Sequence, residues 1–209
     1  MSDARTEILE RIRAAAVDAV PAIRRQYRGA QGLAGSVDQF AERVAEYRAV
    51  VHRCDEDEVT GVLTTLIDGR AFGAAPGLEW AVSGAIEDNP ALSVEELDAL
   101  AGVITGCALG IAATGTIVLD HAPGQGRRAL TLVPDRHIVV VRAGQLVPDV
   151  PDAIASLDPH RPQTWISGPS AASDIEFNRV EGVHGPRILE VVLVLPSQIG
   201  HGKGLNPTR

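Results

Sequence analysis

The run ILEVVLVL, residues 188–195, is apolar at every position except its glutamate and is rich in β-branched side chains. HIVVV at 137–141 has the same character. Similar short runs, bounded by turn residues, are TIVLD at 116–120, ALTLV at 129–133 and TWIS at 164–167. Such runs predict β-strands. Because they are continuously apolar rather than alternating, both faces of these strands are expected to be buried, as in a parallel sheet covered by helices.

Helical periodicity dominates the first half of the chain instead. Apolar residues recur every three or four positions from residue 4 to about 20, which predicts an amphipathic helix that ends or kinks near Pro21. Ser36 with Gln39, and Ser93 with Glu96, have the form of capping boxes that begin two further helices. The expected apolar stripe of the helix after Ser36 is Val37, Phe40, Val44, Tyr47 and Val51.

The acidic segment DEDE at 55–58 is interpreted as the solvated start of another helix. Helices in the first half and buried strands in the second predict an α/β fold, with a mostly parallel sheet flanked by helices and a helical N-terminal extension. We divide the chain into an N-terminal extension and linker at 1–35, an α/β domain at 36–196 and a flexible tail at 197–209.

Residues 99–119 carry no charge and contain the GxxxGxxxG run typical of membrane helices. Three threonines and the flanking acids Asp98 and Asp120 argue against a membrane span. We expect a buried strand, a tight turn with a short helix, and a second buried strand.

Composition narrows the classes of partner. A net charge of -8 repels nucleic-acid backbones, and aromatic residues, at 3%, offer few surfaces for base stacking. The two cysteines, Cys54 and Cys107, are too few and too far apart for a zinc ribbon or an iron–sulfur cluster, so we expect no metal or cofactor on this chain. The N-terminus has no secretory signal pattern, and a cytoplasmic location is expected.

Glycine-punctuated segments carry the first candidate site. The turn TGT at Thr114–Thr116 and the segment GQGRR at 124–128 could bind a phosphate or carboxylate through backbone N–H groups and an arginine such as Arg127. Spacing alone favours the alternative, a hairpin with a basic tip.

Two polar loops form the second candidate, SGPSAASDIE at 167–176 and EGVHGP at 181–186. Ligands gather at the carboxyl ends of strands in open α/β sheets, and the first loop follows the strand TWI. A strand-to-helix connection without a ligand is an equal alternative. The acidic residues and His184 of these loops could bind a metal ion, or Ser170 and His184 could act as a nucleophile and its base. Neither spacing matches that of a known metal-binding or catalytic motif. The other histidines, at 52, 121, 137, 160 and 201, are interpreted as surface or core residues.

The ordered pattern of TGTIVLD, SGPS, DIE and GVHGP resembles the LUD domain, in particular its lactate utilisation protein C group, from about residue 103 to 195. The resemblance implies a NagB/RpiA/CoA-transferase-like (Rossmann-like) fold. It also implies a part in oxidising L-lactate to pyruvate, beside two iron–sulfur partner proteins that hold the clusters. Relatives often have glutamate before the TGT turn, where this chain has Ala113.

The resemblance and the loops together mark one pocket or partner surface. The candidate residues are Thr114, Gly115, Thr116, Arg127, Ser167, Gly168, Pro169, Ser170, Ser173, Asp174, Glu176, Glu181, His184 and Gly185. Of these, Arg127, Ser173 and Glu181 come from the local chemistry; the family pattern also covers Gly182 and Pro186.

Two other functions remain open beside the lactate role. The first is a stand-alone enzyme for a phosphorylated sugar, a CoA ester or a folate-like molecule, using Arg127 or Arg128 for the anion and Glu181 or His184 for acid–base work. The second is a ligand-binding regulator without chemistry.

Overall fold

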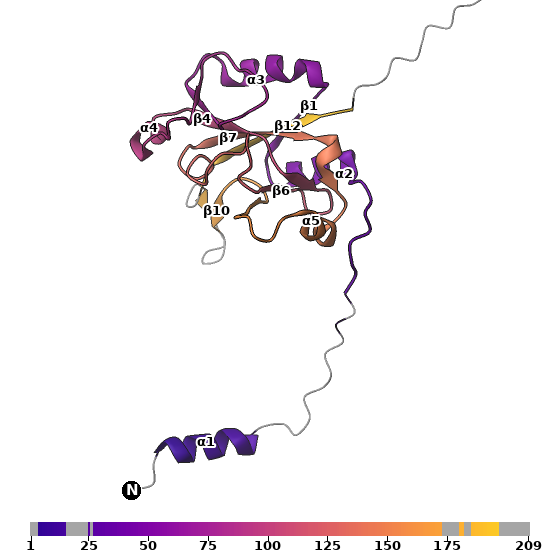
Figure 1. Ribbon diagram of the computed structural model, residues 1–209, viewed down its shortest axis with the longest axis vertical. Coiled ribbons are helices and arrows are strands. Elements are labelled where there is room, and N and C mark those ends of the chain that lie inside the picture. The colour runs from indigo at the N-terminus through magenta and orange to yellow at the C-terminus, as the bar shows by residue number, and fades with distance from the viewer. Residues whose placement is uncertain (1–3, 16–24, 26, 173–179, 182–184, 197–209) are drawn as a thin grey trace, which may run out of the picture.

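A six-stranded parallel sheet forms the centre of the chain in the computed structural model, which describes residues 4–15, 25, 27–172, 180–181 and 185–196 (Figure 1). Its strand order is β1-β12-β7-β4-β2-β3. The bounds are β1 Val50–Cys54, β2 Phe72–Ala74, β3 Ala85–Glu87, β4 Gly102–Thr105, β7 Arg136–Arg142 and β12 Ile188–Val194. The predicted α/β fold with a mostly parallel sheet is confirmed.

The strands β7 and β12 are neighbours inside this sheet and pair in parallel from Ile188 with Arg136 to Val194 with Arg142. Ile138 and Val140 on β7 pack toward α3 (Val59–Ile67), whereas Val139 and Val141 pack on the opposite face. Both faces are therefore buried, which is why these strands read as continuous apolar runs.

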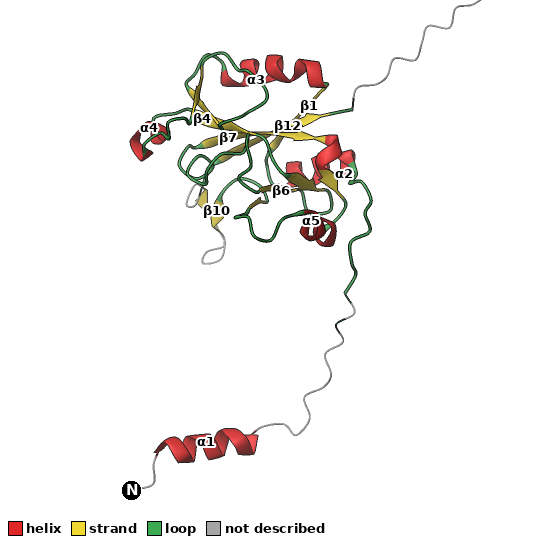
Figure 2. Cartoon of the chain, in the orientation of Figure 1, coloured by secondary structure: helices red, strands yellow, loops and turns green. Residues whose placement is uncertain are grey.

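A helix covers one face of the central sheet. Figure 2 shows α3 on that side, where the side chains Val59, Leu63 and Ile67 recur at helical spacing and are fully buried or nearly so. The 3-10 turn η1 (Glu56–Glu58) precedes α3, so the acidic segment does begin a helix, as predicted.

A second sheet and α2 (Val37–Glu46) cover the other face, and α5 (Val150–Ser156) packs on the outer side of the second sheet. Its strand order is β8-β5-β6-β9, and β6 pairs antiparallel with both β5 and β9. The bounds are β5 Leu109–Ile111, β6 Thr116–Leu119, β8 Leu146–Val147 and β9 Thr164–Ile166. The sequence did not predict this sheet as a separate layer. The remaining short elements are α4 Val94–Asp98, η2 Ala143–Gln145, β10 Ala171–Ala172 and β11 Val180–Glu181.

Two predictions for this part of the chain need correction. Residues 99–119 contain the two expected buried strands, β4 and β6, but β5 takes the place of the expected short helix, and the three strands are divided between the two sheets. ALTLV at 129–133 is not a strand but a series of turns, in which Thr131 N–H donates to Arg128 O and Leu132 N–H to Ala129 O. The hairpin with a basic tip, which needed that strand, is therefore absent from the described chain.

The helix starts were predicted better than the helix ends. Ser36 Oγ accepts from Gln39 N–H, and Ser93 with Glu96 forms a complete capping box. However, α2 ends at Glu46, and Val51, predicted in its apolar stripe, lies in β1. Arg48 has φ 66, a left-handed conformation that a continuing helix excludes.

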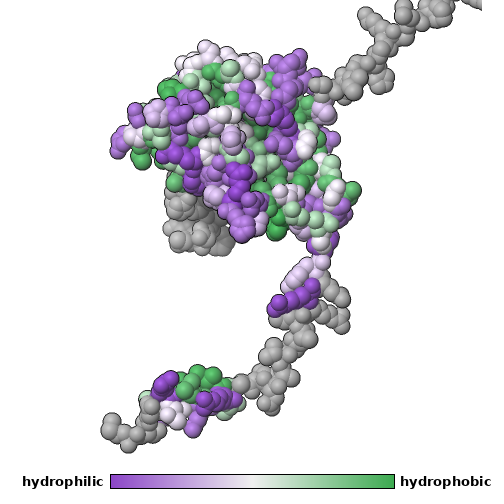
Figure 3. All heavy atoms as spheres, viewed as in Figure 1, coloured by the Kyte–Doolittle hydropathy of each residue, from purple (hydrophilic) through white to green (hydrophobic). Residues whose placement is uncertain are grey.

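The helix α1 (Ala4–Ala15) confirms the predicted N-terminal helix as far as the described residues extend. Its side chains Ile8, Leu9 and Ile12 are exposed. Figure 3 shows an apolar patch on this helix. Among the described helices, none has the length and apolar character needed to cross a membrane.

The segment just before Ser36 is held against α5. Asp152, a buried carboxylate on α5, accepts from the N–H groups of Gln31 at 2.6 Å and Gly32 at 2.9 Å. Gly35 N–H donates to Leu146 O at 2.8 Å, which adds the segment to the edge of the second sheet at β8. These bonds order residues that the sequence predicts to be a linker.

Replacing Asp152 with alanine tests this attachment. Loss of the carboxylate removes two hydrogen bonds to a charged acceptor, at a cost of about 1.5–3 kcal/mol. Amide hydrogen exchange at Gln31 and Gly32, measured by NMR, is expected to accelerate by about tenfold or more. Asp158→Ala is the matched control, because the Asp158 carboxylate accepts a local N–H from His160 in an exposed turn. Unchanged exchange in Asp152→Ala would contradict the attachment.

Candidate functional site

A cavity of about 250 Å³ lies between the central sheet and β9. The loop that follows β9 forms one wall, and the start of β12 forms another. Its described lining consists of Arg128, Thr131, His137, Thr164, Trp165, Ile166, Ser167, Gly168, Pro169, Ser170, Gly185, Pro186 and Leu189. The structure therefore brings together SGPS and the glycine and proline of GVHGP, which are far apart in the sequence.

Backbone contacts hold these two loops together. Ser170 N–H donates to Pro186 O at 2.8 Å. Gly168 has φ +88, and a Cβ on it would lie 2.5 Å from Tyr47 Cβ, so the turn needs glycine both for its conformation and for its close approach to Tyr47. The SGPS turn therefore packs closely against Tyr47, the residue that follows the last residue of α2.

The TGT turn supports the cavity without lining it. Thr114 Oγ1 lies 2.7 Å from Thr116 Oγ1, which lies 2.9 Å from Ser167 Oγ. Thr116 is buried, so this chain of hydroxyls orients Ser167 from the second sheet. Gly115 has φ +60, and a Cβ on it would lie 2.7 Å from the backbone of Arg43, which gives this glycine a packing role against α2.

The two adjacent arginines differ in their surroundings. Arg127 Nε donates to Asp88 Oδ2 at 2.7 Å and its guanidinium also donates to Leu92 O, away from the cavity lining. Arg128 lines the cavity, where it donates to Thr131 O at 2.9 Å and Thr131 Oγ1 at 3.0 Å. The role of Arg127 in binding a ligand stays a prediction. Arg128 is the positively charged side chain among the described residues that line the cavity.

His137 is the cavity residue whose role sequence reasoning missed. It is 1% exposed and lies 2.7 Å from Thr105 Oγ1 through Nε2. Burial, with a smaller effect from the positive charge of Arg128, lowers the pKa of His137 to about 4. His137 is interpreted from the sequence as a surface or core residue, and the structure places it in the core. The one available signal was a polar residue at the start of an apolar strand.

The neutral imidazole and the guanidinium give the cavity a defined chemistry. A neutral ring can donate one hydrogen bond and accept another, whereas the guanidinium donates only. With the hydroxyls of Thr131 and Ser167, these groups can bind a small anion that also carries a hydroxyl or carbonyl oxygen.

Several other predicted site residues lie beyond what the structure describes. Ser173, Asp174, Glu176 and His184 lie outside the described residues. Glu181 lies in β11, but its side chain is also outside the description. Within the described part of the chain, no group of three or more histidine, cysteine or acidic side chains could hold a metal ion.

The cavity opens at an edge of the sheet that the sequence did not predict. His137 and Leu189 lie near the amino ends of β7 and β12, so the cavity is at the amino edge of the central sheet. Among the strands that contribute described lining residues, β9 presents its carboxyl end here, and β9 belongs to the second sheet.

Comparison with known proteins gives consistent matches over this region. Residues 94–194 match the model of the LUD domain. A Deinococcus radiodurans protein named lactate utilization protein C is 44% identical over 165 residues, or 75% of this chain and 78% of that protein. A Bacillus pumilus protein of the same name is 40% identical over 84 residues, 36% of this chain and 35% of that protein. The crystal structure of a DUF162 family protein from Deinococcus radiodurans matches with a TM-score of 0.65 and 39% identity, over 75% of this chain and 94% of that one.

The low pKa of His137 predicts a pH-dependent stability. The unfolded histidine binds a proton below pH 6.5, whereas the folded one does so only near pH 4. The stabilisation is therefore complete above pH 6.5 and is lost as the pH falls toward 4, by up to about 3 kcal/mol. Urea unfolding of the parent and of His137→Asn between pH 7 and 4.5 measures the share of the pH dependence that is due to His137. The other titratable groups are the same in both proteins, so their contributions cancel in the comparison.

His160→Asn is the control, because His160 is exposed. It is expected to follow the parent at every pH. If His137→Asn shows the same pH slope as the parent, the buried neutral imidazole is not the cause.

Proposed function

The chain belongs to the LUD domain family, and on that premise we propose that it acts in lactate utilisation, as the subunit without clusters in a system that oxidises L-lactate to pyruvate. The role in lactate utilisation is supported by the Deinococcus radiodurans relative, which bears that name and is matched over 78% of its length. The finer proposal, a small-carboxylate pocket in this chain and iron–sulfur clusters in two partner proteins, rests on the chemistry of the cavity and on the cysteine content.

The cavity described above suits a small hydroxy- or keto-carboxylate. Its volume of about 250 Å³ is below that of most pockets for drug-sized ligands. Arg128 supplies a guanidinium for the carboxylate, and Thr131, Ser167 and the neutral His137 supply partners for the second oxygen function. The described lining includes no carboxylate that would repel the ligand. This set of groups is the observation that carries the proposal.

Electron transfer requires another carrier. Oxidation of lactate to pyruvate releases two electrons and two protons. An iron–sulfur cluster generally needs four protein ligands, and this chain has two cysteines, both buried and packed in different core clusters. Burial raises the pKa of the Cys107 thiol to about 12, which opposes formation of a ligating thiolate. Clusters held by partner proteins would accept the electrons.

Affinity purification from anaerobically lysed, lactate-grown cells tests this proposal. Two cysteine-rich proteins should co-purify with the tagged chain, and the preparation should reduce a dye in a lactate-dependent manner. A chain that purifies alone, and whose deletion leaves growth on lactate unchanged, would refute the role in lactate oxidation.

Arg128→Gln in the same preparation tests the pocket. Loss of a charged hydrogen bond to the substrate costs about 1.5–3 kcal/mol, so the KM for lactate should rise by about tenfold to a hundredfold while the partners still co-purify. Arg53→Gln is the matched control, since Arg53 is exposed and pairs with Asp38 at the surface. An unchanged KM in Arg128→Gln would exclude this cavity as the lactate site.

A further inference from the structure

The opposite edge of the central sheet carries a second hollow, of about 50 Å³. It lies where β2, β4 and β7 end, and Gly77, Gly106 and Gly124 contribute to its walls. The chain continues from β2 to β3 on one side and then to β4 and β7 on the other, so the strand order reverses between β2 and β4. Carboxyl ends at such a reversal form a crevice that binds ligands in open α/β sheets.

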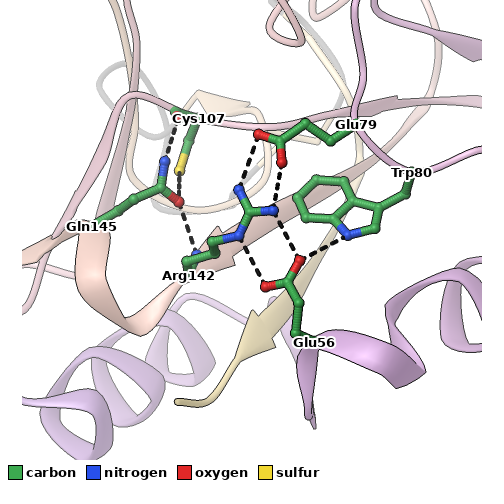
Figure 4. A network of polar contacts seen from close by, with 6 residues as sticks. All are labelled: Glu56, Glu79, Trp80, Cys107, Arg142 and Gln145. Atoms are coloured by element: carbon green, nitrogen blue, oxygen red, sulfur yellow. Dashed lines mark hydrogen bonds and ion pairs between the residues drawn. The ribbon is translucent and has the colours of Figure 1, made fainter. Parts of the chain in front are cut away.

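Arg142, the last residue of β7, lies in this crevice between two carboxylates (Figure 4). Its guanidinium donates to both oxygens of Glu56, at 3.0 and 2.9 Å, and to both oxygens of Glu79, at 3.1 and 2.7 Å. The guanidinium carbon lies 4.5 Å from the centre of the Trp80 ring. Fork-shaped, bidentate pairing is the geometry by which arginine recognises a carboxylate.

The two carboxylates are held to different degrees. Glu56 belongs to η1 and also accepts from Trp80 Nε1 at 3.2 Å, so it is fixed by two partners. The Glu79 side chain is 66% exposed and extends from a loop between β2 and β3 that has Gly77 and Gly84 at positive φ. Exposed ion pairs contribute only about 0–1 kcal/mol, so exchanging Glu79 for another carboxylate costs little.

The rest of the crevice suits an incoming anion. When Glu79 withdraws, the positive charge of Arg142 is neutralised by Glu56 alone. A bound monocarboxylate then replaces the negative charge that Glu79 contributed. Gln145 fixes the backbone of Arg142 by accepting from its N–H at 2.9 Å, and donates to Cys107 O at 2.8 Å. The Cys107 thiol faces this hollow uncharged, because burial raises its pKa.

We propose that Arg142 is a second binding site, for a small monocarboxylate, and that Glu79 occupies it from within the chain when no ligand is bound. The ligand carboxylate takes the place of the Glu79 carboxylate on the guanidinium, beside Trp80, and Glu79 moves into solvent. This site shares no residue with the cavity lined by Arg128, and it does not depend on the proposed role in lactate oxidation.

The two tryptophans of the chain allow each site to be observed alone, because Trp80 lies on Arg142 and Trp165 lines the other cavity. In Trp165→Phe, the fluorescence of Trp80 is expected to change saturably on titration with sodium L-lactate, against sodium chloride at equal ionic strength. Glu79→Gln in this background removes the internal competitor and, for an ion pair worth up to about 1 kcal/mol, is expected to tighten binding by about twofold to fivefold. Arg142→Gln should abolish the change.

Glu46→Gln is the matched control, because Glu46 is also an exposed glutamate paired with an arginine, Arg43 on α2. It should bind lactate as the Trp165→Phe parent does. If Glu79→Gln binds no more tightly than this parent, or Arg142→Gln keeps the response, the proposal is wrong. Should Arg142→Gln not fold, the comparison of Glu79→Gln with its parent decides alone. Titration of Trp80→Phe reports on the Trp165 cavity, so failure at one site is distinguished from failure at the other.

Discussion

Burial of β7 and β12 on both faces is the constraint on which the other layers depend. The two strands pair over seven residues each, and their side chains alternate between two apolar cores. One core needs α3 as a cover and the other needs α2 and the second sheet. The loops that leave the second sheet, including SGPS, are thereby brought to the amino edge of the central sheet.

The strand β7 also positions the polar groups at both edges of the central sheet. His137 lies near the start of β7 and Arg142 at its end, five residues apart, or roughly 16 Å at the usual rise of a strand. Polar residues at the two ends of an apolar strand lie where the sheet meets its loops, so each can face a cavity. The apolar residues between them keep the two polar sites separate.

Much of the fold was predictable because its signals are local. Continuous apolar runs located β6, β7, β9 and β12, and hydroxyl side chains marked the first residues of α2 and α4. ALTLV was mistaken for a strand because its composition is that of a strand, whereas only Leu130 and Thr131 within it are buried and the backbone turns around them. The division of residues 99–119 between two sheets depends on strand partners distant in sequence, which local patterns do not encode.

The candidate site was predictable in its loops and less so in its charged groups. SGPS and the end of GVHGP were expected to meet, and the bond from Ser170 to Pro186 joins them. The distinction between Arg127 and Arg128 was inaccessible, because it depends on Asp88, which lies 39 residues before Arg127. The importance of His137 likewise follows from tertiary burial, which determines its protonation state.

The two proposed sites should bind their ligands almost independently. They open at opposite edges of one sheet, and the residues between them on β7 are fully paired with β12 and buried, which leaves no second arrangement for this strand. Coupling between sites requires an element with two discrete states that both ligands bias. The loop that carries Glu79 could take two states, but its movement ends at Arg142 and does not reach His137. A ligand at the carboxyl edge is therefore expected to change the surface formed by Glu79 and Trp80, and to leave the affinity of the other cavity unchanged.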